Sequence, residues 1–406
     1  MSQPLPYGGF RWIDEHEASK FDVNSIPTDG PGGYILEVDL EYPRDLHDSH
    51  TDLPLCPVRE KPPDKRDEKL LATVCDKERY VIHYWNLQQC LRHGLRLKKI
   101  YRFLRFDQSP WLRSYIELNT MLRTQATNEF AKNLFKLMNN AVFGKTMENV
   151  RNHVDVKLVT RWDGRYGAKA LISKPNFHSS SIFDENLVAI ELRKLRVKFE
   201  KPVYVGMCIL DISKTCLYSF HYDYMLPNFG QKCKVLYTDT DSLICELECE
   251  NMYSITKRDI ARFDTSDYAE GNVYGMPPAN KKVPGLMKDE NNGMIMTECV
   301  GLRAKMYTTR VLDKDDVKKI KGIKKNITVD KITFDDYIQS LKNHTETTIR
   351  QNCIRSKLHN VYSISEQKIA LSPHDDKKCV LTNGVNTLPW GHYCIAEEND
   401  DDVEMM

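Results

Sequence analysis

Two aspartates, Asp239 and Asp241, lie one residue apart inside an otherwise apolar stretch that runs from Lys234 to Cys245. Apolar residues precede and follow them, so two short strands joined by a tight polar turn are predicted. Two carboxylates at such a tip repel each other, so a cation is expected over them, and oxygen ligands alone favour Mg²⁺ or Mn²⁺. The competing interpretation is an ordinary turn, because Asp and Ser form local hydrogen bonds there.

A third aspartate, Asp39, lies near the end of a predicted strand that runs from Tyr34 to Leu40. Pro43 follows shortly afterwards and cannot donate a hydrogen bond to a neighbouring strand, so the strand should stop before it. Taken alone, Asp39 is more often a residue that ends a strand and bonds to its own turn. A shared site with the two hairpin aspartates is the alternative interpretation.

A helix from about Thr127 to Met147 should carry a polar stripe, since Lys132, Lys136 and Asn140 recur every four residues. One turn further along the same line come Phe143 and Gly144. The opposite, apolar face consists of Phe130, Leu134, Leu137, Met138 and Val142. A lysine stripe is ordinarily a solvated face, but cations and an amide without an intervening carboxylate suit a phosphate tail better.

Periodicity and turn residues predict the remaining elements. In chain order they are a surface loop at 44–67, two strands within 70–84, a helix at 86–93, a strand at 95–106, a helix capped by Ser109-Pro110 and ending near Arg123, a helix at 202–225, a single strand at 301–310 bearing Lys305 and Tyr307, and helices at 334–341 and about 345–357.

Composition limits what the chain can be. With 406 residues, 41% of them hydrophobic, it can bury several cores and should form two or more subdomains. The net charge is only +1, so affinity for nucleic acid must come from a local patch. Such a patch lies between Arg303 and Lys331 and includes Lys321, Lys324 and Lys325.

Cysteine usage and hydropathy indicate in which cellular compartment the protein should reside. The twelve cysteines include no Cys-x-x-Cys pair, so buried free thiols in a reducing compartment are expected, with zinc as the second alternative. No apolar run approaches ~20 residues and the N-terminus lacks the features of a signal peptide. A soluble intracellular protein that does not bind membranes is therefore predicted, with a solvated acidic tail after residue 396.

In this order the features resemble the polymerase domain of family B DNA polymerases, and most closely the protein-primed branch found in organelles, viruses and Polinton/Maverick transposons. The resemblance covers nearly the whole chain and rests on four motifs. These are Val38-Asp39-Leu40-Glu41-Tyr42-Pro43, Lys136-Leu-Met-Asn-Asn140-Ala-Val-Phe143-Gly144, Tyr237-Thr-Asp239-Thr-Asp241-Ser242 and Lys305-Met-Tyr307.

The resemblance assigns roles to the motif residues. Nucleotidyl transfer uses two divalent ions about 3.5–4 Å apart. By resemblance Asp39 and Asp241 hold both Mg²⁺ or Mn²⁺ ions, the Leu40 carbonyl assists one of them, and Asp239 supports the site. The other implied roles are Lys136, Lys132 and Arg123 on the triphosphate of a dNTP, Asn140 and Phe143 around the nascent base pair, Gly144, Lys305 and Tyr307 along the primer-template, and Lys321, Lys324 and Lys325 on duplex phosphates. Tyr42 would contact the nucleotide sugar and exclude ribonucleotides.

The resemblance also implies an α+β fold with right-hand polymerase architecture. The N-terminal proofreading exonuclease typical of the family is not expected here, because only 38 residues precede Asp39. The expected divisions are palm at 1–59, an α+β insertion resembling a terminal-protein region at 60–115, fingers at 116–150, palm again at 151–311, and a thumb with the acidic tail at 312–406. The insertion would contact a terminal priming protein. Relative to the family pattern, the first motif is two residues shorter, and Ala141 and Phe143 replace Ser and Tyr.

Three functions remain open at this stage. The first is a DNA-directed DNA polymerase core that replicates a transposon or virus-like element without proofreading. The second is a truncated, transposon-derived protein that binds DNA and has no polymerase activity. A reverse transcriptase is the third, and it is disfavoured because Thr240 separates two acids that are normally adjacent in those enzymes.

Overall fold

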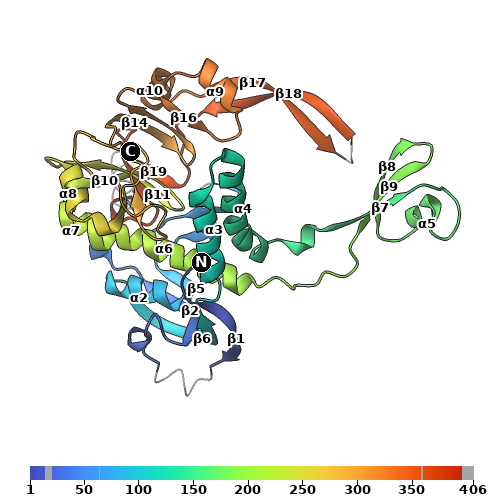
Figure 1. Cartoon of the computed structure of the whole chain (residues 1–406), viewed down its shortest axis with the longest axis horizontal. Coiled ribbons are helices and arrows are strands. Elements are labelled where there is room, and N and C mark those ends of the chain that lie inside the picture. The colour runs from blue at the N-terminus through green and yellow to red at the C-terminus, as the bar shows by residue number, and fades with distance from the viewer. Residues whose placement is uncertain (14–20, 64, 358–359, 396–406) are drawn as a thin grey trace, which may run out of the picture. The chain divides into compact units, whose positions relative to one another are not determined.

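The computed structural model describes residues 1–13, 21–63, 65–357 and 360–395, so the predicted acidic tail lies outside the described residues. Two compact units form. The first comprises Met1–Asn139, Met207–Thr347 and Ile369–Met406, and the second comprises Asn140–Gly206 and Thr348–Lys368. Their elements are labelled in Figure 1, and each unit is described by itself.

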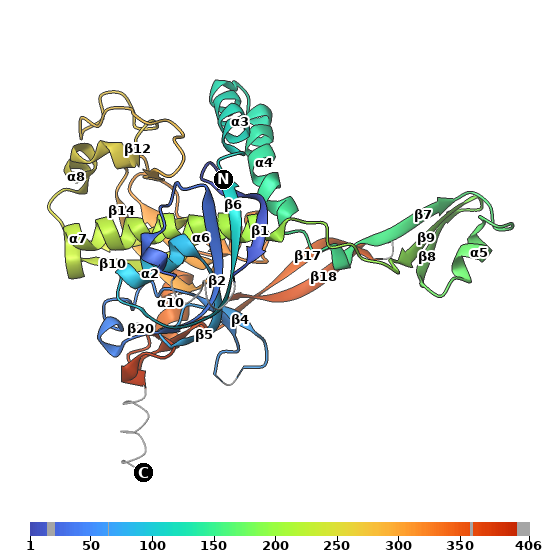
Figure 2. The same cartoon turned by 90° about the horizontal axis from the view of Figure 1, so that it is seen from below.

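A four-stranded antiparallel sheet in the first unit carries Asp39. Its order is β1 (Leu5–Trp12), β6 (Arg96–Ser109), β2 (Gly32–Glu41) and β5 (Lys77–His83), seen in Figure 2. Side chains alternate along β2, so that Leu36, Val38 and Leu40 point into the core while Asp39 points to the other face. Helix α2 (Tyr84–Arg92) packs on the same core through Leu87 and Cys90.

The remaining elements of the first unit follow along the chain. They are β3 (Val58–Glu60), β4 (Lys69–Leu71), α3 (Arg113–Gln125), the start of α4 (Glu129–Thr146), most of α6 (Val203–Ser219), the π-helix Phe220–Met225, α7 (Leu226–Phe229), β10 (Cys233–Asp239), β11 (Ser242–Leu247), α8 (Met252–Arg258), β12 (Phe263–Asp264), β13 (Met287–Lys288), β14 (Met296–Arg303), β15 (Met306–Val311), β16 (Val317–Ile320), α9 (Lys325–Lys331), α10 (Phe334–Asn343), β19 (Lys378–Val380) and β20 (Thr387–Pro389).

The second unit has a core of its own. Strands β7 (Val154–Val159), β9 (Leu187–Arg193) and β8 (Phe177–Asp184) form a sheet in that order, and α5 (Ala168–Ile172) packs on it through Leu171. Most of the hairpin of β17 (Thr347–Lys357) and β18 (Asn360–Leu371) belongs to this unit as well. The sequence did not predict the β7–β9 sheet, whose strands are separated by turn-rich segments.

Several predicted elements are confirmed, including β2, α2, α4, the long helix that begins at Val203, the acidic hairpin and α10. Two helix predictions need correction. The helix expected after Ser109-Pro110 begins only at Arg113, because Ser109 still belongs to β6. The segment expected to be helical near residues 345–357 is strand β17, where β-branched residues at its start favour an extended chain.

Two further corrections concern residues 44–67 and 301–310. The first segment is not wholly at the surface, because Leu53, Leu55 and Cys56 are buried in the main core. The second is two strands, β14 and β15, joined by a turn that contains Lys305 in a left-handed conformation, φ 62°. Lys305 therefore lies at a hairpin tip and does not alternate with Tyr307 along one strand.

The sheet also bears on the expected α+β insertion at 60–115. Strands β5 and β6 from that segment flank β2, the strand that carries Asp39, whereas β4 pairs with β3 in a small two-stranded sheet. All twelve cysteines are free thiols, and four of them are buried: Cys56, Cys90, Cys208 and Cys233. Among the described residues, Val203–Lys232 is the one helix long and apolar enough to cross a membrane, and 44% of its most apolar window is buried inside the protein.

Candidate functional site

The acidic hairpin has the predicted geometry. Asp239 pairs with Ser242 across β10 and β11, which leaves a two-residue turn of Thr240 and Asp241. Thr240 adopts the left-handed conformation, φ 59°, which a β-branched residue rarely does. The Asp241 amide and the Ser242 hydroxyl both donate to the Asp239 carbonyl, at 2.6 and 3.2 Å. The turn thus holds Asp241 exposed at the tip and Asp239 half-buried behind it.

A second hairpin tip meets the first. Lys305, in the turn between β14 and β15, places its Nζ 3.5 Å from Oδ2 of Asp239. Its backbone amide donates to the Tyr237 hydroxyl at 3.2 Å, and the rings of Tyr237 and Tyr307 lie 4.5 Å apart. Partial burial, followed by the charge of Asp239, raises the pKa of Tyr307. The structure therefore brings together the third and fourth sequence motifs.

Asp39 lies in a separate group of polar contacts. The Arg79 amide donates to Oδ1 and the Tyr101 hydroxyl donates to Oδ2, both at 2.8 Å. These hydrogen bonds, the amide first, lower the pKa of Asp39. The cations of Arg79 and Lys99 lie 4.4 and 4.3 Å from the centre of the Tyr101 ring. Leu40, the neighbour expected to offer a carbonyl to a metal, has its side chain in the core.

Sequence reasoning missed Tyr101 and Arg79. Both lie on strands that flank β2, and Asp39 pairs with Lys99, two residues before Tyr101. The alternation of basic and apolar residues in β6 was a visible signal, but its register against β2 could not be read from the sequence.

Tyr42 lies inside the main core. Its side chain is 4% exposed, its hydroxyl is 2.8 Å from Nδ1 of His50, and it accepts the Leu55 amide at 3.2 Å. Burial raises the pKa of Tyr42 strongly. The hydroxyl is thus part of the packing of the chain just after Asp39, and a contact of this ring with a nucleotide sugar stays a prediction.

The predicted polar stripe lies on α4. Lys136 is exposed, while Lys132 pairs with Glu129 at 2.9 Å, so the stripe does have a carboxylate neighbour. Further along the same helix Asn140 and Gly144 are exposed and Phe143 is half-buried.

The apolar face of α4 is open to solvent, with Phe130 78% and Leu137 63% exposed. On the preceding helix, Arg123 has its backbone carbonyl engaged by the Nζ of Lys282 at 3.2 Å.

Some basic side chains of segment 303–331 bond to other protein groups, and others are exposed. Arg310 pairs with Asp316, and the Nζ of Lys318 donates to the carbonyls of Val329 and Ile332. Lys321, Lys324 and Lys325 have exposed side chains, and the Lys321 amide donates to the Lys305 carbonyl at 3.2 Å. The exposed lysines therefore start beside the tip that carries Lys305.

The carboxylates can be tested as metal ligands by their chemistry and by their placement. Oxygen donors at strand ends suit Mg²⁺ or Mn²⁺. Within the described part of the chain, however, no three His, Cys, Asp or Glu residues are grouped to hold a metal ion. Mg²⁺ is often held by one or two carboxylates plus substrate phosphates, so a group of three protein ligands is not required for it.

No protein-family model and no curated protein sequence matches the chain. Its fold is similar to that of phi29 DNA polymerase. The ternary complex of that enzyme with primer-template DNA and incoming nucleotide superposes with a TM-score of 0.56 at 14% identity, over 91% of this chain and 55% of that one. The complex with single-stranded DNA gives a TM-score of 0.51 at 14% identity, with the same coverage. The chain thus has a mixed helix and sheet fold like that of a DNA polymerase and spans about 55% of the polymerase chain.

Proposed function

We propose that the chain is a DNA-directed DNA polymerase core with palm, fingers and thumb, which adds deoxynucleotides to a primer 3′-hydroxyl. The observation that carries this proposal is the meeting of the Asp239 and Lys305 hairpins. Two turns, each with a left-handed residue, bring acidic and basic side chains from different strands to one point. The fold similarity to phi29 DNA polymerase supports the same reaction class.

In this proposal Asp39 and Asp241 hold two Mg²⁺ or Mn²⁺ ions, with the Leu40 carbonyl as a further ligand. The ions would activate the primer hydroxyl and hold the triphosphate and its leaving group. Asp239 forms an ion pair with the Lys305 ammonium and so holds a positive charge beside the exposed Asp241. The chain's own contribution is positioning and charge neutralisation, which dominate phosphoryl-type transfer.

The remaining residues divide between nucleotide and DNA. Lys136, exposed on α4, would bind the triphosphate, with Lys132 and Arg123 nearby, Asn140 and Phe143 around the base pair, and Tyr42 on the nucleotide sugar. Lys305, Tyr307 and Gly144 would hold the primer-template close to the acids. Lys321, Lys324 and Lys325 would bind duplex phosphates, which lysines contact without reading sequence.

The biological setting is a further part of the proposal. The polymerase would replicate a transposon or virus-like element, prime on a terminal protein, and act inside the cell at the site of element replication, in the nucleus where the host has one. The motifs of the protein-primed branch support this setting.

One observation favours a second candidate, a DNA-binding protein without polymerase activity. Both carboxylate oxygens of Asp39 accept hydrogen bonds from protein groups, and the described residues hold no grouped metal ligands. A protein of this kind would keep the basic surface and bind primer-template with a strong salt dependence, but would not extend it.

Primer extension separates the two candidates. The native chain and Asp241→Asn are incubated with a DNA primer-template, dNTPs and Mg²⁺, and binding of the same DNA is measured in parallel. Asp313→Asn is the matched control, because Asp313 is also an exposed aspartate in a hairpin turn, between β15 and β16. Extension by the native chain and the control but not by Asp241→Asn supports the polymerase. Binding without extension by any of the three supports the second candidate.

A further inference from the structure

A short loop, residues 279–285, is held rigidly against the end of α3. Two of its non-glycine residues, Asn280 and Lys282, adopt left-handed conformations with φ of 57° and 56°. The Asn280 side chain donates to the carbonyls of Ile260 and Phe263, at 2.9 and 3.0 Å. The Lys282 amide donates at 2.8 Å to Asp264, a carboxylate only 8% exposed. Strained backbone of this kind persists only where its surroundings hold it, and it often marks a functional segment.

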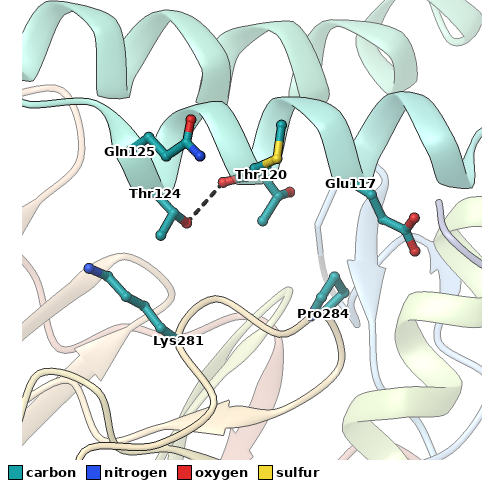
Figure 3. Close-up of a pocket in the computed structure, with 7 residues that line it drawn as sticks. Glu117, Thr120, Thr124, Gln125, Lys281 and Pro284 are labelled. Carbon is teal, nitrogen blue, oxygen red and sulfur yellow. Dashed lines mark hydrogen bonds between the residues drawn. The ribbon is translucent and has the colours of Figure 1, made fainter.

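The loop and α3 line an open pocket of about 320 Å³, shown in Figure 3. The loop contributes Lys281 and Pro284, and α3 contributes Glu117, Thr120, Met121, Thr124 and Gln125. The Lys281 ammonium and the Glu117 carboxylate lie toward opposite sides of this view. The Nζ of Lys282, the residue after Lys281, donates to the carbonyl of Arg123 at 3.2 Å, and Arg123 directly precedes Thr124. Among the lining residues Lys281 is the cation and Glu117 the anion, and Lys282 lies beside the C-terminal end of α3.

Other cations lie close enough to Lys282 to act on its charge. The pKa of Lys282 is lowered, first by partial burial and then by the nearby charges of Arg123, Lys281 and Lys132, while Asp267 acts in the opposite direction. Gathering like charges on an anchored loop opposes folding, since each repels the others. A bound anion that neutralises them would remove this cost. Phosphate suits such a group because lysine and arginine both bind it through charge-assisted hydrogen bonds.

We propose that Lys281 and Lys282, together with the end of α3, form an additional binding site for the polyphosphate of a nucleotide. The inference rests on the proposed polymerase function and deepens it, because Arg123 and Lys132 are already expected to bind the triphosphate from the fingers. A nucleotide is favoured over a DNA backbone because the site is a small pocket bordered by Met121 and Pro284, whereas the exposed lysines near Lys321 suit a duplex.

Substitutions at Lys282 separate charge from structure. Lys282→Gln removes the charge but keeps a side-chain donor for the Arg123 carbonyl, whereas Lys282→Met removes both. Lys281→Gln removes the second charge, and Lys169→Gln, an exposed lysine in the other unit, controls for the loss of one charge. Binding of dATP and of inorganic tripolyphosphate is measured in Mg²⁺ by titration calorimetry on the full chain. The thermal midpoint of each variant shows whether it folds.

We expect roughly tenfold weaker binding of both probes for Lys282→Gln and for Lys281→Gln, the effect of losing one charge-assisted contact. Lys169→Gln should bind like the native chain. If Lys282 only caps α3, then Lys282→Gln binds both probes normally while Lys282→Met melts earlier, and the inference is wrong.

Two further readouts place the ligand and separate this inference from the polymerase proposal. If the loop binds DNA instead, the variants lose affinity for primer-template and its salt dependence becomes shallower, while dATP binding is unchanged. That result overturns the inference. If the native chain extends no primer but binds dATP in a manner that requires Lys281 and Lys282, the inference stands and the polymerase proposal fails. If the native chain extends the primer while Lys281→Gln and Lys282→Gln bind dATP as tightly as the native chain does, the polymerase proposal stands and the inference fails.

Discussion

The Nζ of Lys305 lies 3.5 Å from Oδ2 of Asp239, although the two residues belong to hairpins that are far apart in the sequence. Both side chains are partly exposed, 55% for Lys305 and 36% for Asp239. Exposed ion pairs contribute only about 0–1 kcal/mol to folding. The pair therefore does little for stability, and its value lies in fixing where the ammonium points.

Loss of the Lys305 charge should harm function more than folding. For Lys305→Met we expect the free energy of unfolding to change by less than about 1 kcal/mol. Primer-template binding should weaken by roughly tenfold, the effect of one lost phosphate contact. Urea unfolding and DNA binding at fixed salt provide the two measurements.

Lys305→Arg is the control for this prediction, because it keeps the charge beside Asp239. It should retain most of the affinity for primer-template. A Lys305→Met protein that unfolds much more easily but binds DNA normally would show that the contact with Asp239 is structural only.

The hydroxyl of Tyr101 donates to Oδ2 of Asp39, and a metal ion bound to that oxygen in the proposed site would compete with it. Tyr101→Phe removes that donor while the ring and its cationic neighbours, Arg79 and Lys99, remain. The variant should therefore bind Mn²⁺ at a lower concentration than the native chain, since no hydroxyl competes for Oδ2. Mn²⁺ titration followed by electron paramagnetic resonance measures this directly.

Tyr115→Phe is the matched control for Tyr101→Phe, because the Tyr115 hydroxyl donates to the Met138 carbonyl on α4 and touches no acid. Its Mn²⁺ affinity should equal that of the native chain. Weaker Mn²⁺ binding by Tyr101→Phe would mean instead that the hydroxyl holds Asp39 in the geometry that binds metal.

The hydroxyl of Tyr42 should matter for folding. It links His50 to the amide of Leu55 inside the core, so Tyr42→Phe leaves that buried amide without its acceptor. We expect a loss of about 1–3 kcal/mol in the free energy of unfolding. Discrimination against ribonucleotides should persist, because the ring remains. Chemical denaturation tests the first statement and incorporation of rNTP against dNTP tests the second.

Much of the acidic site was readable from the sequence because it is local. A tight turn between two apolar strands specifies where Asp239 and Asp241 lie, and Pro43 marks the end of the strand that bears Asp39. Lys305 was expected on a strand, yet a left-handed residue splits that strand into a hairpin. Only the pairing of β14 with β15, a tertiary outcome, decides between these two local structures.

The neighbours of Asp39 could not be predicted for the same reason. Tyr101 reaches it only because β6 pairs with β2 in one register, and a slip of one residue would turn Tyr101 to the other face. Lys281 and Lys282 meet the end of α3 through a loop whose path depends on its contacts with Asp264 and Phe263. Nothing in their local sequence indicates that partner.

Folding stability should fall as the solution is acidified below neutrality. Burial lowers the pKa of His50 and of His83 to about 4, whereas both titrate near 6.5 when the chain is unfolded. The unfolded chain therefore binds protons first, so the stability present above about pH 6.5 is lost as the pH falls toward 4. The loss should reach a few kcal/mol. Urea midpoints at pH 7.5 and 5 measure it.

His83 offers the sharper test, since its side chain is fully buried and its amide donates to the buried Asp211. His83→Gln should unfold more easily at both pH values, because a buried amide replaces a packed ring, but its stability should depend less on pH. His374→Gln, at an exposed position, should keep the native pH dependence. The quantity to compare is the change in the free energy of unfolding between pH 7.5 and pH 5. The packing cost of the substitution is the same at both pH values and cancels in this difference. An unchanged pH dependence in His83→Gln would mean that other groups cause the acid sensitivity.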